Sequence, residues 1–157
     1  MKRLMTLLTV LFLGVQIGTA QSDVEEIDFI QSIMGAEKKE VMSQFVNLQG
    51  PAADAFWKLY DEYEVKRKSL GKERIALIKQ YAAEYDGITS EQTDALMSKA
   101  IKLRNSNDKL VDTYYKKIKK VAGSKAAAQF HQLESYIQAS IRTELFSNIP
   151  LIGELDN

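Results

Sequence analysis

Few side chains in this sequence could perform chemistry. The 157 residues contain no cysteine and one histidine, His131, which excludes thiol catalysis, cysteine-based or paired-histidine metal sites and a histidine-based triad. Carboxylates are abundant, but they alternate with lysines at helical spacing, which is typical of a solvated helix surface. The sequence has no phosphate-binding glycine loop and no nucleophile elbow. We therefore expect no enzymatic activity, no cofactor and no metal.

Two arginines interrupt an otherwise apolar helix face. Arg67 and Arg74 lie two turns apart in the stretch 52–85. The simpler interpretation is that their alkyl chains cover the apolar face while the guanidinium groups pair with carboxylates such as Glu64 or Asp108. The alternative is a basic pair inside a surface that binds other proteins.

Aromatic residues are concentrated near the start of the same stretch, at Phe56, Trp57, Tyr60 and Tyr63. Trp57 and Tyr60 turn away from the centre of the apolar face, so we expect them to pack under a neighbouring helix. If they stay exposed, they form a recognition patch for other proteins. The candidate protein-binding residues are Phe56, Trp57, Tyr60, Arg67 and Arg74.

The elements that position these residues are predicted from apolar spacing of three and four residues. The spacing predicts an all-α fold with four helices, at residues 22–49, 52–85, 90–122 and 125–148. The second helix would extend for roughly 50 Å, at about 1.5 Å per residue. Because the turn at 86–89 is short, the second and third helices should form an elongated antiparallel hairpin.

Local signals mark the predicted helix ends. Ser22 and Thr89 are expected N-caps, with Gln92 completing a capping box at the second of them. Gly50 precedes a proline, an arrangement that suits the end of one helix and the start of the next. Gly123 is expected to end the third helix.

The hairpin pairing places Tyr63 near Tyr114 and Gly71 near Asn107. Asn107 brings an amide into an otherwise apolar seam between the helices. We expect Gly71 to permit a close approach of the two backbones there. We also expect Asn107 to fix the register of the pair, as polar seam residues do in coiled coils.

The N-terminal residues 1–20 have the pattern of a secretory signal peptide. Lys2 and Arg3 precede an apolar run that ends in small residues, and the run is too short to cross a membrane comfortably. We expect cleavage between Ala20 and Gln21, which would leave no stable membrane anchor. The predicted location is periplasmic or secreted.

Residues 21–157 are then expected to form a single helical domain with an apolar C-terminal tail at 149–157. Removing residues 1–20 takes away two of the 21 basic residues and none of the 21 acidic ones, which leaves a net charge of −2. A chain so balanced has no electrostatic reason to bind nucleic acid. Leu151, Ile152 and Leu155 in the tail must pack back or contact a partner.

The entry of the third predicted helix carries a recognisable motif. Residues 88–92, Ile-Thr-Ser-Glu-Gln, resemble the Leu-Thr-x-x-Gln motif of the Spy and CpxP family of small periplasmic chaperones and stress sensors. The resemblance implies a thin, curved hairpin, often an antiparallel dimer, that holds unfolded clients on a concave face of mixed basic and apolar character. Only Thr89 and Gln92 carry over from the motif, as cap residues.

Two functions are consistent with these observations. The first is an exported, ATP-independent, chaperone-like protein that binds protein clients and could form a homodimer. The alternative is a helical adaptor or stress-regulatory protein that docks one dedicated partner through the helix at 52–85 or the tail at 151–155. A client-binding surface should tolerate many partners and be salt-sensitive, whereas a dedicated interface should be flat and apolar.

Overall fold

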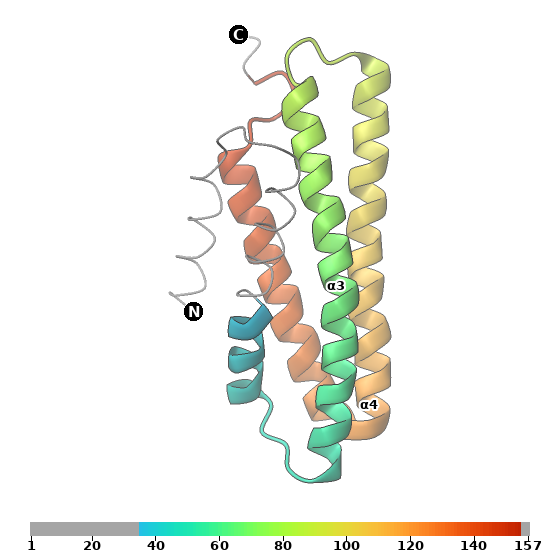
Figure 1. The fold of residues 1–157 in the computed structure, drawn as a ribbon, viewed down its shortest axis with the longest axis vertical. Helices are drawn as coiled ribbons and strands as arrows, with labels where there is room; N and C mark the ends of the chain where they lie inside the picture. Colours follow the sequence, from blue (N-terminus) through green and yellow to red (C-terminus); the bar gives the residue numbers. More distant parts are fainter. Residues whose placement is uncertain (1–34, 155–157) are drawn as a thin grey trace.

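A computed structural model describes residues 35–154, and every regular element in this part of the chain is helical. The elements are a helix at 35–45, α3 (Pro51–Glu84) and α4 (Ser90–Asn148). The beginning of α4 runs antiparallel to α3, and its end returns along the other side of α3 (Figure 1). The predicted all-α class is confirmed.

The predicted helices at 90–122 and 125–148 form the two arms of the element α4. They meet at Gly123, whose backbone angles of φ 83° and ψ 170° are not helical. This conformation is essentially restricted to glycine, so Gly123 bends the chain sharply and no separate loop is needed. With α4 taken as one element, the described residues contain three helices rather than the four that were predicted, and the predicted break at Gly123 is confirmed.

The helix predicted at 22–49 ends earlier than expected, at residue 45. Val46 is buried with 4% of its surface exposed, and the side-chain amide of Gln129 donates a 2.7 Å hydrogen bond to the carbonyl oxygen of Phe45. That carbonyl would accept from residue 49 if the helix continued. The part of this predicted helix at 22–34, with its cap Ser22, lies outside the described residues.

The turn between α3 and α4 forms as predicted. The Thr89 hydroxyl accepts a hydrogen bond from the backbone N–H of Gln92 at 3.2 Å, and the Gln92 side chain accepts from the backbone N–H of Thr89 at 2.9 Å. This reciprocal capping box satisfies two donors that a helix start otherwise leaves open. Farther along the hairpin, the rings of Tyr63 and Tyr114 lie 5.6 Å apart, which confirms the predicted pairing.

Asn107 is buried in the seam, as expected, but its bonding differs from the prediction. Its side-chain amide donates to the carbonyl oxygen of Leu103 at 2.9 Å. Both residues belong to α4, so this hydrogen bond does not cross to α3. The register of the hairpin must therefore be set by other contacts.

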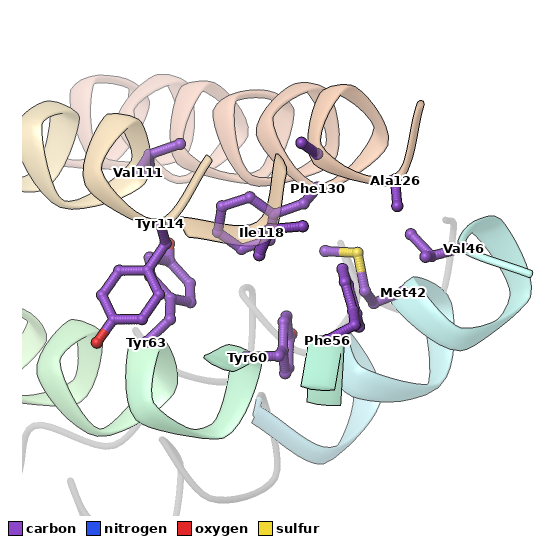
Figure 2. Close-up of a cluster of buried hydrophobic side chains, with 11 residues drawn as sticks. Met42, Val46, Phe56, Tyr60, Tyr63, Val111, Tyr114, Ile118, Ala126 and Phe130 are labelled. Atoms are coloured by element: carbon purple, nitrogen blue, oxygen red, sulfur yellow. The ribbon is translucent and has the colours of Figure 1, made fainter. Parts of the chain in front are cut away.

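The hydrophobic core lies at the end of the bundle where α4 bends. Side chains from the helix at 35–45, from α3 and from both arms of α4 converge there (Figure 2). Several aromatic pairs meet edge to face, including Tyr63 with Phe130 at 5.0 Å between ring centroids. The core residues are Met42, Val46, Phe56, Tyr60, Tyr63, Val111, Tyr114, Ile118, Ala126, Ala127 and Phe130.

The requirement for glycine at position 123 can be tested by substitution. An alanine there cannot adopt the observed angles without strain, so Gly123→Ala should lower the free energy of unfolding by about 1–3 kcal/mol. Urea unfolding measures this loss. Lys125→Ala, at an exposed neighbouring position, is the control and should change the free energy by less than about 0.5 kcal/mol. Equal effects of the two substitutions would contradict the role given to Gly123.

Candidate functional site

Charged groups are buried where the helix at 35–45 meets the rest of the bundle. Lys38 has 1% of its surface exposed, Glu134 0% and Glu64 9%. Together with Tyr63 and Arg67 they form what we call the Lys38 cluster. Burying an ion without a partner is costly, so the geometry of the cluster decides whether it stabilises the bundle.

Hydrogen bonds connect every member of the Lys38 cluster. The Lys38 ammonium donates to Glu64 Oε1 at 2.8 Å and to Glu134 Oε2 at 2.9 Å. The Tyr63 hydroxyl donates to the same oxygen of Glu134 at 2.7 Å. Arg67 Nε donates to both oxygens of Glu64, at 2.9 and 3.0 Å. The network thus joins the helix at 35–45, α3 and the second arm of α4.

The electrostatics of the cluster favour its charged form. Burial alone would raise the pKa of Glu64, but the positive charges of Lys38 and Arg67 outweigh it, and the pKa lies below its ordinary value. Burial, followed by the negative charge of Glu134, raises the pKa of Tyr63 far above the ordinary value. Tyr63 therefore remains a neutral hydroxyl that can donate to Glu134.

The Lys38 cluster has the form of a structural ion network rather than a catalytic site. Two cations face two carboxylates, and solvent does not reach the ammonium of Lys38. Catalytic acids and bases need contact with a substrate, and the closed cluster offers no path to one. Within residues 35–154, no three His, Asp or Glu side chains are grouped so as to hold a metal ion.

The cluster was missed by the sequence analysis, although a signal was present. Lys38 and Glu134 stand among other charged or polar residues and resemble solvated positions. However, Lys38 comes four residues before Met42, and Glu134 comes four residues after Phe130, so each lies on the apolar face of its helix. A lysine and a glutamate on two apolar faces can form a buried pair.

The predicted aromatic residues mostly belong to the core. Phe56 and Tyr60 are completely buried, and the Tyr60 ring packs edge to face against Phe130 on the second arm of α4. Trp57 is partly buried beside the helix at 35–45, with the ammonium of Lys39 5.5 Å from its ring. The expectation that these aromatics pack under neighbouring helices is confirmed, and Phe56 and Tyr60 are not available to a partner in this conformation.

The two predicted arginines have different surroundings. Arg67 pairs with Glu64, which confirms the simpler interpretation for this residue. Arg74 is partly buried, and its pKa is lowered by burial and then by the positive charges of Arg142 and Arg67, against which Asp108 acts in the opposite direction. Arg74 thus lies within electrostatic range of Arg67 on the same helix and of Arg142 on the second arm of α4.

The single histidine, His131, lies at the surface of the second arm of α4. His131 Nε2 lies 3.1 Å from an oxygen of the exposed Asp112, so His131 is a helix-surface residue, as expected.

No helix among residues 35–154 is long and apolar enough to span a membrane. The predicted cleavage site at Ala20 and Gln21 lies outside the described residues.

The described part of the C-terminal tail folds back onto the end of the hairpin. Two tyrosine hydroxyls donate to its carbonyl oxygens, Tyr81 to Pro150 at 2.8 Å and Tyr85 to Leu151 at 3.0 Å. Three large apolar side chains nevertheless stay open to solvent: Phe146 is 71% exposed, Leu151 60% and Ile152 45%. We call these three residues the tail patch.

A second surface combines apolar and basic groups on the first arm of α4. It is a shallow depression of about 460 Å³. Ile101, which is 44% exposed, contributes apolar surface, and two lysines contribute positive charge. The lining residues are Ser98, Ile101, Lys102, Asn105, Ser106 and Lys109.

No protein-family model, no curated protein and no solved structure matches this chain. The function therefore has to be argued from the surfaces described above.

Removing the ammonium at the centre of the Lys38 cluster should be severely destabilising. Lys38→Met leaves two carboxylates buried without their main counter-charge, and breaking a buried pair in this way costs about 3–5 kcal/mol. Lys39→Met is the matched control, because Lys39 pairs with Asp61 at the surface, where both side chains are about half exposed, and should cost about 1 kcal/mol or less. Chemical unfolding measures both; similar losses would contradict a central role for Lys38.

Stability should also fall in acid through Glu64. Because the pKa of Glu64 is lower in the folded than in the unfolded chain, its ionised form adds stability above the ordinary pKa of 4.5, and this contribution is lost as the pH falls below that value. Unfolding free energies between about pH 7 and about pH 3 should show the decline. In Glu64→Gln the decline should be shallower, and an unchanged slope would rule out this contribution.

Proposed function

We propose that this protein is exported and binds other proteins without ATP. The observation that carries the proposal is the tail patch, in which Phe146 near the end of α4 and Leu151 and Ile152 in the tail are exposed, while Tyr81 and Tyr85 hold the tail by hydrogen bonds. Exposed apolar side chains grouped on an ordered surface are typical of protein interaction sites. Export rests on the signal-peptide pattern at 1–20.

The buried state of the α3 aromatics favours a dedicated partner over many clients. Phe56 and Tyr60 have no exposed surface, so they cannot form the adaptable aromatic face that a general chaperone would use without unpacking the core. The tail beside the tail patch is held in place by the hydroxyl groups of Tyr81 and Tyr85. An ordered apolar patch of this kind suits one complementary surface, because little entropy is lost on binding.

Chaperone-like binding of several clients is the second candidate. It is supported by the shallow depression on the first arm of α4, where Ile101 lies among Lys102 and Lys109, and by the partly exposed Met97 on the same arm. Mixed basic and apolar surface can hold segments of many sequences weakly. The motif at 88–92 points in the same direction by resemblance to the Spy and CpxP family.

Two measurements test the proposal and separate the two candidates. The double variant Leu151→Asp, Ile152→Asp should weaken partner binding by about a hundredfold, because each side chain contributes about 1.5 kcal/mol of apolar burial. Val65→Asp is the matched control, since Val65 is 71% exposed on α3 outside the tail patch. Binding is measured by affinity purification from the compartment that contains the protein, followed by titration of the purified partner.

The second measurement follows the aggregation of several unrelated denatured proteins at stoichiometric amounts of this protein. Suppression that survives the tail substitutions but is lost at high salt would favour the chaperone-like candidate. One partner that binds the control variant but not the tail variant would favour the adaptor. Absence of both a partner and any suppression would refute the proposal.

A further inference from the structure

The end of the bundle where α4 bends carries a group of exposed lysines. Residues 113–133 contain five lysines and no carboxylate, and all five lysines are exposed. Four of them lie within about 6 Å along the axis of the first arm of α4, and the fifth follows the bend. We call this group the lysine end: Lys116, Lys117, Lys119, Lys120 and Lys125.

Neighbouring segments do not neutralise the lysine end. Residues 41–50 carry no charge, and in residues 51–60 the single carboxylate, Asp54, is offset by Lys58. Asp112 is the carboxylate nearest to the lysines in sequence, but it lies 3.1 Å from Nε2 of His131. The surplus of positive charge therefore stays at the surface.

Aromatic contacts show how the lysine end borders on α3. The ammonium group of Lys117 lies 4.6 Å from the centre of the Tyr114 ring, and that of Lys66 on α3 lies 5.5 Å from the same ring. Ammonium groups at this distance from an aromatic ring are attracted to it. Tyr114 thus brings a lysine of α3 and a lysine of the lysine end to one place on the surface.

The helix dipole accounts for only part of this arrangement. Cations near the C-terminus of a helix stabilise it, but the effect falls off within the last turn. Helical backbone angles are interrupted at Gly123, so Lys119 and Lys120 lie in the last turn before the bend and Lys116 lies before that turn. Lys125 begins the second arm, where the dipole favours a negative charge. The lysine end is thus more basic than the stability of α4 requires.

The opposite end of the bundle has the reverse charge. The first arm of α4 separates its bend from the hairpin turn by roughly 50 Å (Figure 1). Residues 80–98 and 143–154, at the hairpin turn and the tail, contain six carboxylates and no basic residue, with Lys79, Lys99 and Arg142 at their borders. Because the separation is several times the screening length of about 8 Å at physiological ionic strength, each end acts on a partner independently.

Apolar side chains accompany the lysines. Val121, which directly follows Lys120, is 44% exposed, and Phe45 is 50% exposed. The carbonyl oxygen of Phe45 accepts a hydrogen bond from the side chain of Gln129, so Phe45 lies beside the first turns of the second arm. Lysines next to exposed apolar side chains are typical of surfaces that bind membranes, because lipid headgroups attract the ammonium groups and the interface accepts the apolar groups.

We propose that the lysine end docks this protein on the surface of a membrane that contains anionic phospholipids. The ammonium groups contact the lipid phosphates, while Val121 and Phe45 enter the headgroup layer. A flat lipid surface suits lysines that are spread over the outside of a helix and a bend. Since the same surface repels the acidic end, the bundle is oriented with the tail patch away from the membrane, where a protein partner can reach it.

Vesicle binding tests the proposal. Protein purified from the compartment that contains it should sediment with vesicles of phosphatidylcholine and phosphatidylglycerol but not with phosphatidylcholine alone, and high salt should release it. The variant Lys119→Glu, Lys120→Glu should bind about thirtyfold more weakly. Its matched control, Lys72→Glu, Arg104→Glu, reverses the same charge at exposed positions farther along the bundle and should lose less than about threefold. Equal losses in the two variants, or equal binding to both kinds of vesicle, would overturn the proposal.

A labelling measurement keeps the proposal falsifiable if a charge variant fails to fold. The chain has no cysteine, so Ser124→Cys at the bend and Ser90→Cys at the start of α4 each provide one exposed site for a fluorophore. A quencher attached to the lipids of the mixed vesicles should quench the fluorophore at position 124 and not the one at position 90. Equal quenching at the two positions, or none at position 124, would overturn the proposal.

Two further comparisons separate this proposal from other uses of the surface. If the protein bound soluble polyglutamate more tightly than the mixed vesicles, and the lysine substitutions abolished that binding, the lysine end would be a site for acidic proteins and the membrane proposal would be wrong. The tail variant Leu151→Asp, Ile152→Asp should bind the vesicles as the unaltered protein does. Loss of vesicle binding in the tail variant would overturn the proposed orientation, whatever its effect on a protein partner.

Discussion

The arrangement of the bundle depends on one ammonium group that bonds to carboxylates on two other helices. Lys38 reaches Glu64 on α3 and Glu134 on the second arm of α4 at the same time. A buried ion pair of this kind adds little net stability compared with apolar packing, because both partners lose their hydration. The pair instead makes the packing specific, because any rotation or slide of the helix at 35–45 would leave charges buried without partners. The network therefore favours one packing of three helices over the alternatives that their apolar faces would permit.

The bundle changes character from one end to the other. At the end where α4 bends, aromatic rings from α3 and from both arms of α4 fill the core together with Met42 from the helix at 35–45 (Figure 2). Beyond the Lys38 cluster, the partly buried Arg74 on α3 lies within electrostatic range of the partly buried Arg142 on the second arm of α4. The tail patch lies at the far end, near the hairpin turn. One end thus provides stability, and the surfaces proposed for protein binding lie along the rest of the bundle.

Local signals in the sequence predicted most of the helix ends, because each end depends on neighbours within a few residues. The capping box of Thr89 and Gln92 formed as expected, and α3 begins at Pro51 directly after Gly50, but Gly50 does not end the first helix as was expected. The early end of the first helix at residue 45 depends on Gln129, which is far away in sequence, so no local pattern could predict it. The same limit applies to the Lys38 cluster, whose members look like ordinary surface charges until three helices are brought together. The arginines were predicted as a pair on one helix, but Arg142 joins them only through the tertiary fold.

The contact between Lys38 and Glu134 spans 96 residues of sequence, which has a consequence for the order of folding. The hairpin of α3 and the first arm of α4 needs only a short turn to close, so its loop-closure cost is small. The helix at 35–45 is synthesised before α3 and α4, yet its second carboxylate partner, Glu134, becomes available only after most of the chain has emerged. Until then Lys38 can bond only to Glu64 on α3, so the complete packing of this helix forms late.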